Sequence, residues 1–174
     1  VTRFVRIYFP DYFSRIKDAI NNTAVNKIIS GRMEVISQDP LIVLDGAHNG
    51  AKMKELCFSL RHLYPKQKWI TLISVKKGKS HRQLIRLLEP FVGQFIFSRF
   101  TSDIPDTVYV ATDPKELAAQ TRKPNIIVGN AIKAFAKALQ ISKRNGLPIL
   151  VSGSLYLVGE IRTSWKKSGR LLHG

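Results

Sequence analysis

The residues best placed to do chemistry follow a short apolar run, Leu41–Leu44, which has the composition of a buried strand. Directly after it come a carboxylate, Asp45, a turn containing Gly46, and then His48 and Asn49. In open α/β sheets, ligands bind where strands reach their carboxyl ends, so this turn is predicted to border a ligand site. Asp45 could accept hydrogen bonds from two ribose hydroxyls or support a metal ligand, or it could simply cap the turn.

The two residues after that turn have ordinary interpretations as well. A single loop histidine such as His48 is more often a surface residue than a base or a ligand. Asn49 is a natural N-cap for the helical pattern that follows it. Their proximity to Asp45 makes both of them candidates for the site.

A second candidate region is Ser152-Gly153-Ser154, which follows a strand-like run and precedes a helical pattern. Gly153 would let backbone amides approach an anion, and the helix N-terminus would add partial positive charge. Ser154 could donate its hydroxyl to a carboxylate, or it could serve only as the N-cap. Arg32, beside Gly31, could reach outward to a phosphate or remain solvated. Together these residue types indicate an anionic ligand.

Several motifs that would point to other chemistry are absent. Gly78-Lys79-Ser80 has the ending of a P-loop, but Ile73 occupies the position of its required first glycine. The sequence has no Gly-x-Gly-x-x-Gly dinucleotide motif and no Gly-x-Ser-x-Gly elbow of a serine hydrolase. His48, His62, His81 and His173 show no metal-ligand spacing with each other or with Cys57. A dinucleotide cofactor, a serine hydrolase and a resident metal therefore have no support.

From residue 33 onward, apolar runs typical of buried strands alternate with patterns typical of amphipathic helices. The predicted strands are Met33–Ser37, Leu41–Asp45, Trp69–Val75, Gln94–Ser98, Asn125–Val128 and Ile149–Ser152. The predicted helix faces are Met53, Leu56, Cys57, Leu60, Leu63 and Tyr64; Leu84, Leu87, Leu88 and Phe91; and Ala131, Phe135, Ala138 and Leu139. This alternation predicts an α/β domain of three layers, with helices on both faces of a mostly parallel sheet of about six strands.

Helix ends carry signals of their own. Ser80 with Gln83 three residues later has the capping-box pattern. Asp113 followed by Pro114 combines an N-cap with a proline at the first helical position. Gly146 stands where a helix C-terminus favours a left-handed residue.

The composition fits one domain, or one domain with a remnant of another. The chain has 174 residues, of which 44% are hydrophobic, and 28 Lys and Arg against 12 Asp and Glu give a net charge of +16. This excess favours polyanionic partners such as nucleic acid, anionic lipid, nucleotide phosphates or an acidic substrate. No apolar run reaches the length of a membrane span. Cys57 is the only cysteine, which fits a reducing compartment, and the chain is expected to be cytoplasmic.

Three segments occur together in a recognisable order: Gly31–Glu34, Asp45–Asn49 and Gly153–Arg162. Over roughly residues 30–162, the chain resembles the C-terminal domain of folylpolyglutamate synthase / dihydrofolate synthase, in the Mur ligase superfamily. The resemblance implies an ATP-dependent ligase that activates a folate or pteroate carboxylate as an acyl phosphate, which the amine of L-glutamate then attacks. It also implies an active site between a central P-loop ATPase domain and this Rossmann-like domain.

The resemblance assigns roles to individual residues. Arg32 and Asp45 would bind the nucleotide, His48 and Ser154 would bind glutamate, and Gly46, Asn49 and Gly153 would support the site loops. Residues 1–30 are expected to be a remnant or linker from a missing central ATPase domain, and residues 31–174 the C-terminal domain itself. ATP and Mg²⁺ would serve the full-length enzyme, with Mg²⁺ held mainly by the missing domain. The isolated chain is expected to be a monomer without catalytic competence, without a membrane and without a specific nucleic-acid partner.

The chain departs from the family pattern at several positions. Ser30 and Gly50 replace prolines that are usual in the family, and Lys77-Gly78-Lys79 replaces an Asp-Lys-Asp run. The family's arginine after the fourth strand has no clear counterpart in Thr101–Asp106. Two other interpretations stay open: a Mur-type domain that joins a different amino acid to a different carboxylate, and a non-catalytic basic binding module.

Overall fold

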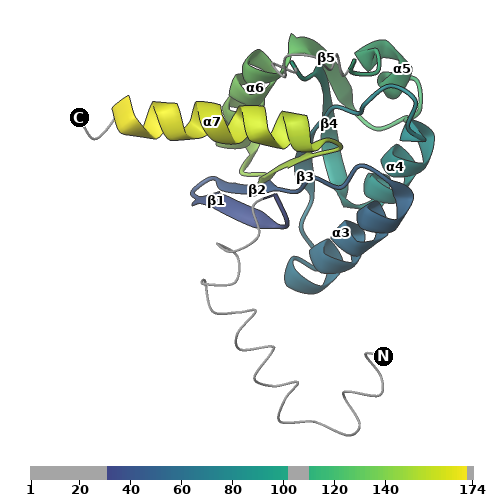
Figure 1. Ribbon diagram of the computed structural model, residues 1–174. Helices are drawn as coiled ribbons and strands as arrows, with labels where there is room; N and C mark the ends of the chain where they lie inside the picture. Colours follow the sequence, from purple (N-terminus) through teal and green to yellow (C-terminus); the bar gives the residue numbers. More distant parts are fainter. Residues whose placement is uncertain (1–30, 102–109, 172–174) are drawn as a thin grey trace, which may run out of the picture.

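A six-stranded sheet forms the centre of the computed structural model, which describes residues 31–101 and 110–171. The strand order is β1-β2-β6-β3-β4-β5; only β1 is antiparallel to its neighbour, and the other pairs are parallel (Figure 1). The strands are β1 (Glu34–Gln38), β2 (Leu41–Leu44), β3 (Trp69–Ile73), β4 (Val92–Arg99), β5 (Asn125–Asn130) and β6 (Ile149–Ser152). Parallel strands require crossover connections, which the helices provide.

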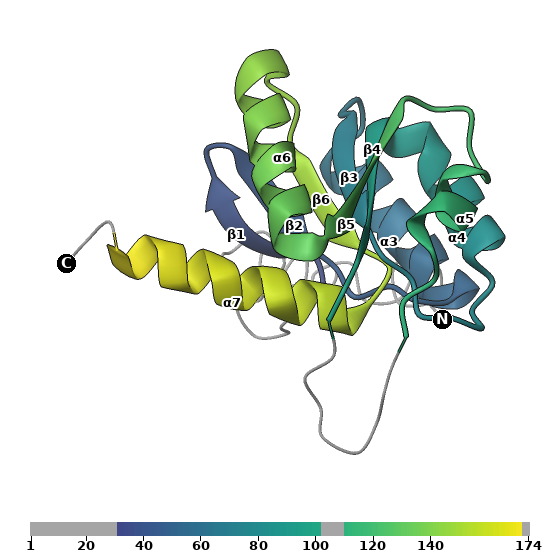
Figure 2. The same cartoon turned by 90° about the horizontal axis from the view of Figure 1, so that it is seen from above.

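Helices cover both faces of the sheet and make a three-layer domain (Figure 2). On one face lie α3 (Gly50–Leu63), α4 (His81–Leu88) with the 3₁₀ turn η1 (Glu89–Phe91), and α5 (Pro114–Ala118). On the other face lie α6 (Ala131–Asn145) and α7 (Leu155–Leu171). The α/β architecture and the mostly parallel sheet expected from the sequence are confirmed.

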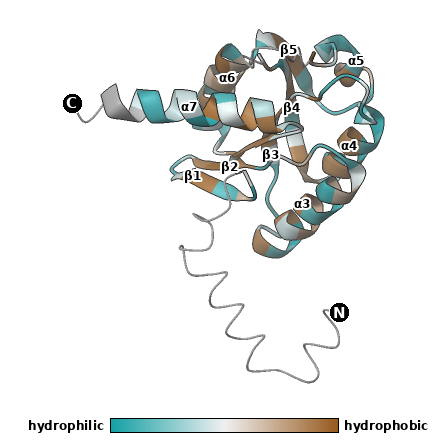
Figure 3. Ribbon diagram, viewed as in Figure 1, coloured by the Kyte–Doolittle hydropathy of each residue, from teal (hydrophilic) through white to brown (hydrophobic). Residues whose placement is uncertain are grey.

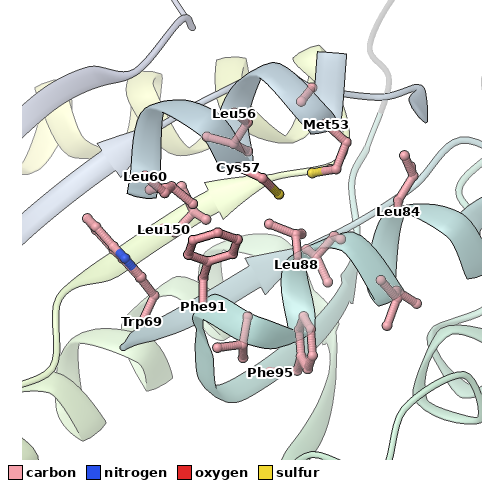
Figure 4. Close-up of a cluster of buried hydrophobic side chains, with 14 of the residues drawn as sticks. Met53, Leu56, Cys57, Leu60, Trp69, Leu84, Leu88, Phe91, Phe95 and Leu150 are labelled. Atoms are coloured by element: carbon pink, nitrogen blue, oxygen red, sulfur yellow. The ribbon is translucent and has the colours of Figure 1, made fainter. Parts of the chain in front are cut away.

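The sheet separates two hydrophobic cores, because successive strand residues point to opposite faces. The helices carry both hydrophilic and hydrophobic residues (Figure 3), and their buried apolar side chains belong to these two cores. Met53, Leu60 and Leu88 meet Trp69 and Phe95 in the core beneath α3 and α4 (Figure 4). Every residue of β3 is buried, as expected for a central strand covered on both faces.

The predicted strands all form, with ends that shift by one to two residues. β4 begins at Val92 and ends at Arg99, and β3 ends at Ile73. Two helix signals are confirmed: the Asp113 side chain accepts a hydrogen bond from the Lys115 N–H, and Gly146 has a φ of 69° at the C-cap of α6.

Two details of the sequence analysis are wrong. Ser80 precedes α4 but makes no side-chain cap, since its φ and ψ of −72° and 68° lie outside the extended conformation of an N-cap. The Gln83 side chain lies instead against Gly50, where an added Cβ would meet its Oε1 at 2.5 Å. Leu63 is 46% exposed, because the buried face of α3 ends at Leu60.

The predictions for residues 1–30 and for most of Thr101–Asp106 lie outside the described residues. Among the helices of residues 31–101 and 110–171, none is both long and apolar enough to cross a membrane.

Candidate functional site

A cavity of about 380 Å³ lies where the carboxyl ends of β2, β6 and β3 come together in the sheet. The loop after β2 contributes His48, and the turn after β6 contributes Gly153 and Ser154. The remaining lining residues are Lys76 and Lys79 from the loop after β3, and Leu155 and Tyr156 from the start of α7. The structure therefore brings together the two residues predicted to bind glutamate, at the edge of the sheet where ligands of α/β domains collect.

His48 is oriented by its own loop. Its Nδ1 lies 2.8 Å from the backbone oxygen of Gly46, and because a carbonyl only accepts, Nδ1 carries the proton. Nε2 makes no hydrogen bond with the described residues, so it is the ring atom available to a ligand in the cavity. Neutral His48 would accept a hydrogen bond at Nε2, and protonated His48 would donate one.

Ser154 serves as the cap of α7 and also lines the cavity. Its Oγ accepts a hydrogen bond from the Tyr156 N–H at 3.1 Å, and the residue is only 3% exposed. The hydroxyl hydrogen is not needed for this contact, so Ser154 can still donate to a carboxylate. Capping and ligand binding, which the sequence presents as alternatives, are compatible in this geometry.

Two glycines allow the loops to approach closely. Gly153 has a φ of 97°, and an added Cβ would stand 2.6 Å from the backbone oxygen of Ser74. Its N–H donates to the Ala47 oxygen at 3.1 Å, which joins the turn after β6 to the loop after β2. At Gly46 an added Cβ would stand 2.2 Å from Cδ2 of Leu155, the first residue of α7.

Asp45 is buried and is not among the described residues that line the cavity. Its Oδ1 accepts the Ala47 N–H at 2.8 Å, and its Oδ2 accepts the Met33 N–H at 2.9 Å. Met33 has a φ of 43°, a conformation that is unusual for a residue with a side chain, and the Asp45 contact helps to hold it. Burial raises the pKa of the Asp45 carboxyl, although both hydrogen bonds act in the opposite direction. In this structure Asp45 fastens the Gly31–Glu34 segment to the loop after β2.

The other predicted residues lie around this centre. Arg32, beside Asp45, makes no side-chain hydrogen bond or ion pair with the described residues, so its guanidinium is available. Asn49 is exposed, and its Oδ1 accepts the Lys52 N–H at 3.0 Å, which confirms it as the N-cap of α3.

The first and third sequence segments meet through an ion pair. Arg162 on α7 donates to both carboxylate oxygens of Glu34 on β1, and Glu34 Oε2 also accepts the Gly31 N–H at 2.8 Å. Although partial burial opposes it, these hydrogen bonds hold the pKa of Glu34 below its usual value. The pair fixes α7, which begins at the cavity, to the strand that follows Arg32.

Sequence reasoning missed Lys76, Lys79 and Tyr156 as lining residues. Lys79 belongs to the Lys77-Gly78-Lys79 run noted as a departure from the family pattern, and Lys76 directly precedes that run. That loop follows β3, so the rule that ligands bind at strand ends was the signal that pointed to it. Tyr156 is held by its ring stacking on Phe100, with centroids 5.3 Å apart. The two cations suit an anionic ligand.

Comparison with known proteins identifies the relatives of this chain. The family model described as the C-terminal domain of dihydrofolate synthetase matches residues 30–164. Dihydrofolate synthetase of Saccharomyces cerevisiae is 34% identical over 125 residues, covering 69% of this chain and 29% of the yeast protein. Dihydrofolate synthase/folylpolyglutamate synthase of Bacillus subtilis is 25% identical over 149 residues, covering 86% of this chain and 33% of the Bacillus protein. The chain thus spans about a third of the length of these relatives.

Solved structures share the fold. Folylpolyglutamate synthase of Mycobacterium tuberculosis, complexed with ADP and AMPPCP, gives a TM-score of 0.70 at 22% identity, covering 79% of this chain and 32% of that one. A bifunctional folylpolyglutamate synthase/dihydrofolate synthase with Mn, AMPPNP and L-glutamate bound gives a TM-score of 0.65 at 18% identity. The match covers 78% of this chain and 31% of that one. With the family model matching residues 30–164, the chain belongs to the dihydrofolate synthetase C-terminal domain family.

Proposed function

We propose that the chain is the glutamate-binding, ATP-contacting domain of an ATP-dependent folate–glutamate ligase. The single observation that carries the proposal is the cavity in which His48 and Ser154 meet, in a chain of this family. The relatives named above include a structure with L-glutamate and a nucleotide analogue bound. These support glutamate as the amino acid and ATP as the nucleotide.

The cavity offers donors to an amino acid with two carboxylates. Ser154 can donate its hydroxyl to one carboxylate, and the N-terminal end of α7 adds partial positive charge. Lys76 and Lys79 stand on the side of the cavity formed by the loop after β3, where the other carboxylate would be attracted. His48 Nε2, if neutral, can accept a hydrogen bond from the ammonium group of the amino acid, which must lose a proton before it attacks.

The nucleotide would lie beside this cavity, toward Arg32. The unengaged guanidinium of Arg32 fits a phosphate, which it can bind with two parallel hydrogen bonds. Asp45 already accepts two backbone N–H groups, so it would contact a ribose hydroxyl only through its remaining lone pairs. No three His, Cys, Asp or Glu side chains in the described residues lie close enough to hold a metal ion, and we place no Mg²⁺ ligand in them.

In the reaction, ATP would supply the phosphoryl group that activates a folate or pteroate carboxylate. The contribution of this domain would be to hold glutamate with its amine directed at that carboxylate, and to neutralise negative charge. The 174-residue sequence contains no P-loop, so we expect the chain alone to release no ADP from ATP in the presence of pteroate and glutamate. ATP-dependent ligation by the purified chain would show this expectation to be wrong.

Glutamate binding can be tested with two matched histidine variants. His48 and His62 each direct Nδ1 at a backbone oxygen, at 2.8 and 2.9 Å, but His62 lies on the outer surface of α3. Titration of ¹⁵N-labelled chain with L-glutamate should shift the amide signals of Gly153 and Ser154. We expect H48A and S154A to raise the Kd about ten-fold each, since a hydrogen bond to a charged ligand contributes about 1.5 kcal/mol or more. H62A should bind as the unchanged chain does.

Two results would count against the proposal. One is that L-glutamate shifts no signal at the cavity; the other is that H62A weakens binding as much as H48A. L-Alanine serves as a ligand control, because it lacks the second carboxylate and should bind at least ten-fold more weakly.

A further inference from the structure

A second basic surface lies away from the cavity, on the side of the domain formed by α4 and the turn after α5. Two adjoining cavities, of about 580 and 350 Å³, share the side chains of Arg82 and Arg86 as lining. Arg122 and Lys123 complete the larger one. We call this surface, defined by Arg82, Arg86, Arg122 and Lys123, the arginine groove. Figure 1 shows α4 and α5 side by side, and Figure 2 shows the same from above.

The cations of the groove are not neutralised by the rest of the domain. Within residues 31–101 and 110–171, the side chains of Arg82, Arg86 and Arg122 have no hydrogen bond or ion pair. All three arginines are exposed. The one carboxylate of the lining, Glu89, accepts the Thr121 hydroxyl at 2.5 Å. Thr121 Oγ1 in turn accepts the Lys123 N–H at 3.1 Å, so Glu89 fixes the turn that carries Arg122 and Lys123.

The composition of the groove distinguishes between classes of partner. Protein partners need apolar or aromatic anchors at the centre of an interface, whereas interfaces with nucleic acid are polar and strongly positive. Among the described residues that line the groove, none is aromatic, and only Leu87 and Ala119 are apolar. Three of its four cations are arginines, whose guanidinium matches phosphate oxygens with two hydrogen bonds.

The spacing suits an extended ligand. Arg82 and Arg86 are four residues apart on α4, one turn and about 6 Å along the helix axis, and therefore point to the same side. Beyond these two arginines, the smaller cavity is lined by other residues at and before α4, and the larger one reaches the turn of Arg122 and Lys123. Without aromatic residues on which bases could stack, contacts would be limited to the backbone of the ligand.

From these observations we propose that the arginine groove binds the phosphate backbone of a nucleic acid without regard to its sequence. This function is separate from glutamate binding, because the groove and the glutamate cavity have no lining residue in common. A failure of one proposal therefore leaves the other intact.

The test uses two charge-reversed variants that match in number and in helical spacing. R82E/R86E changes the groove, and K133E/K137E changes two exposed lysines, also four residues apart, on α6. Binding of a fluorescent 20-nucleotide single-stranded DNA of mixed sequence is measured by anisotropy at several salt concentrations. We expect R82E/R86E to weaken binding at least ten-fold and to reduce the slope of log K against log salt by about 1.4, two lost phosphate contacts at about 0.7 each. K133E/K137E should stay within two-fold of the unchanged chain.

Three results would overturn the proposal. Equal weakening by both variants would mean attraction to the net charge of +16 alone. No weakening by R82E/R86E would place any binding elsewhere. Competition by poly-L-glutamate as strong as that by unlabelled DNA of equal charge would identify an acidic chain, and not phosphate, as the ligand. Unchanged circular dichroism and melting temperature show that each variant is folded.

Discussion

At the scale of single residues, Asp45 holds together the loops on which the candidate site is built. Its two oxygens accept the N–H groups of Ala47 and Met33, and its own N–H donates to Val151 of β6 at 2.9 Å. A residue that is 4% exposed and engaged in this way is a positioning residue in the folded domain.

Replacing Asp45 with asparagine should destabilise the domain. Asn has one oxygen and one NH₂ group, so one of the two backbone N–H donors would face another donor inside the protein. Leaving a buried donor unpaired costs about 1–3 kcal/mol, and we expect D45N to lower the free energy of unfolding by about that amount. Urea unfolding monitored by circular dichroism gives the value. Asn49, the exposed N-cap of α3, supplies the control. N49D keeps an oxygen that accepts the Lys52 N–H, so it should change the free energy of unfolding by less than 0.5 kcal/mol, a small surface effect. A D45N chain as stable as the unchanged one would contradict this account.

His48 and Ser154 could be found from the sequence because each lies in the turn that follows an apolar strand, and strand ends mark ligand sites in this architecture. The Asp45 contact with Met33 could not be found, since it depends on a left-handed residue that carries a side chain. Lys76 and Lys79 could have been chosen by the same rule of strand ends. They were not chosen because their loop is basic where the family pattern is acidic, so the resemblance gave no ligand role to it.

At the scale of elements, the N-caps differ in how well a local pattern predicts them. Asn49 and Asn130 have extended backbones and accept an N–H three residues ahead, at 3.0 and 2.9 Å. Ser80 has the residue type of a cap and a glutamine three residues later, but not the backbone conformation. Residue type is visible in a sequence, whereas the φ and ψ that a loop imposes on its last residue are not.

Alanine substitutions at the caps should separate the real caps from the apparent one. N49A and N130A each remove a side-chain acceptor from a helix N-terminus, so each should lower the free energy of unfolding by about 1 kcal/mol. S80A removes no such bond and should change it by less than 0.5 kcal/mol. Thermal or urea unfolding of the three variants under one set of conditions measures the difference. A loss at S80A equal to that at N49A would mean that Ser80 caps α4 in solution.

The strands were the most predictable elements. Continuous apolar runs such as that of β3 arise because both faces of the central strands are covered, and the chain offers no other place for them. The ends of the strands were less predictable. β4 begins two residues before the predicted start at Gln94, because Val92, which directly follows the 3₁₀ turn η1, already pairs with Trp69. Local composition carries no sign of that pairing.

At the scale of the whole molecule, the pair between Glu34 and Arg162 connects residues 128 positions apart. It fastens α7, a helix that projects along one side of the domain in Figure 1, to the edge strand β1. Trp165 Nε1 adds a second contact between the same elements by donating to the Ile36 oxygen at 3.2 Å. Both charged side chains are mostly buried, with relative exposures of 17% for Glu34 and 21% for Arg162. The long separation explains why the two sequence segments gave no indication that they touch.

This pair should give the domain a definite pH dependence. The pKa of Glu34 is lower in the folded chain than its usual value. Its contribution to stability is therefore fully present above the pKa of the unfolded chain, and it is lost as the pH falls through the pKa of the folded one. We expect E34Q to be less stable than the unchanged chain by about 1.5 kcal/mol at pH 7, since hydrogen bonds between charged partners contribute about 1.5–3 kcal/mol. The difference should shrink toward zero as the pH falls below the folded pKa. Urea unfolding at a series of pH values from neutral to acid measures it.

The matched control is E116Q, which neutralises an exposed glutamate on α5 that forms no ion pair among the described residues. Asp45 and Asp113, whose pKa values also differ from their usual ones, are present in all three chains, so the comparison isolates Glu34. E116Q should follow the pH profile of the unchanged chain. A constant gap between E34Q and the unchanged chain across the acid range would mean that Glu34 contributes by its shape and not by its charge. In that case the charge of the pair would not be what holds α7 against β1, nor what positions the start of α7 at the cavity lined by His48 and Ser154.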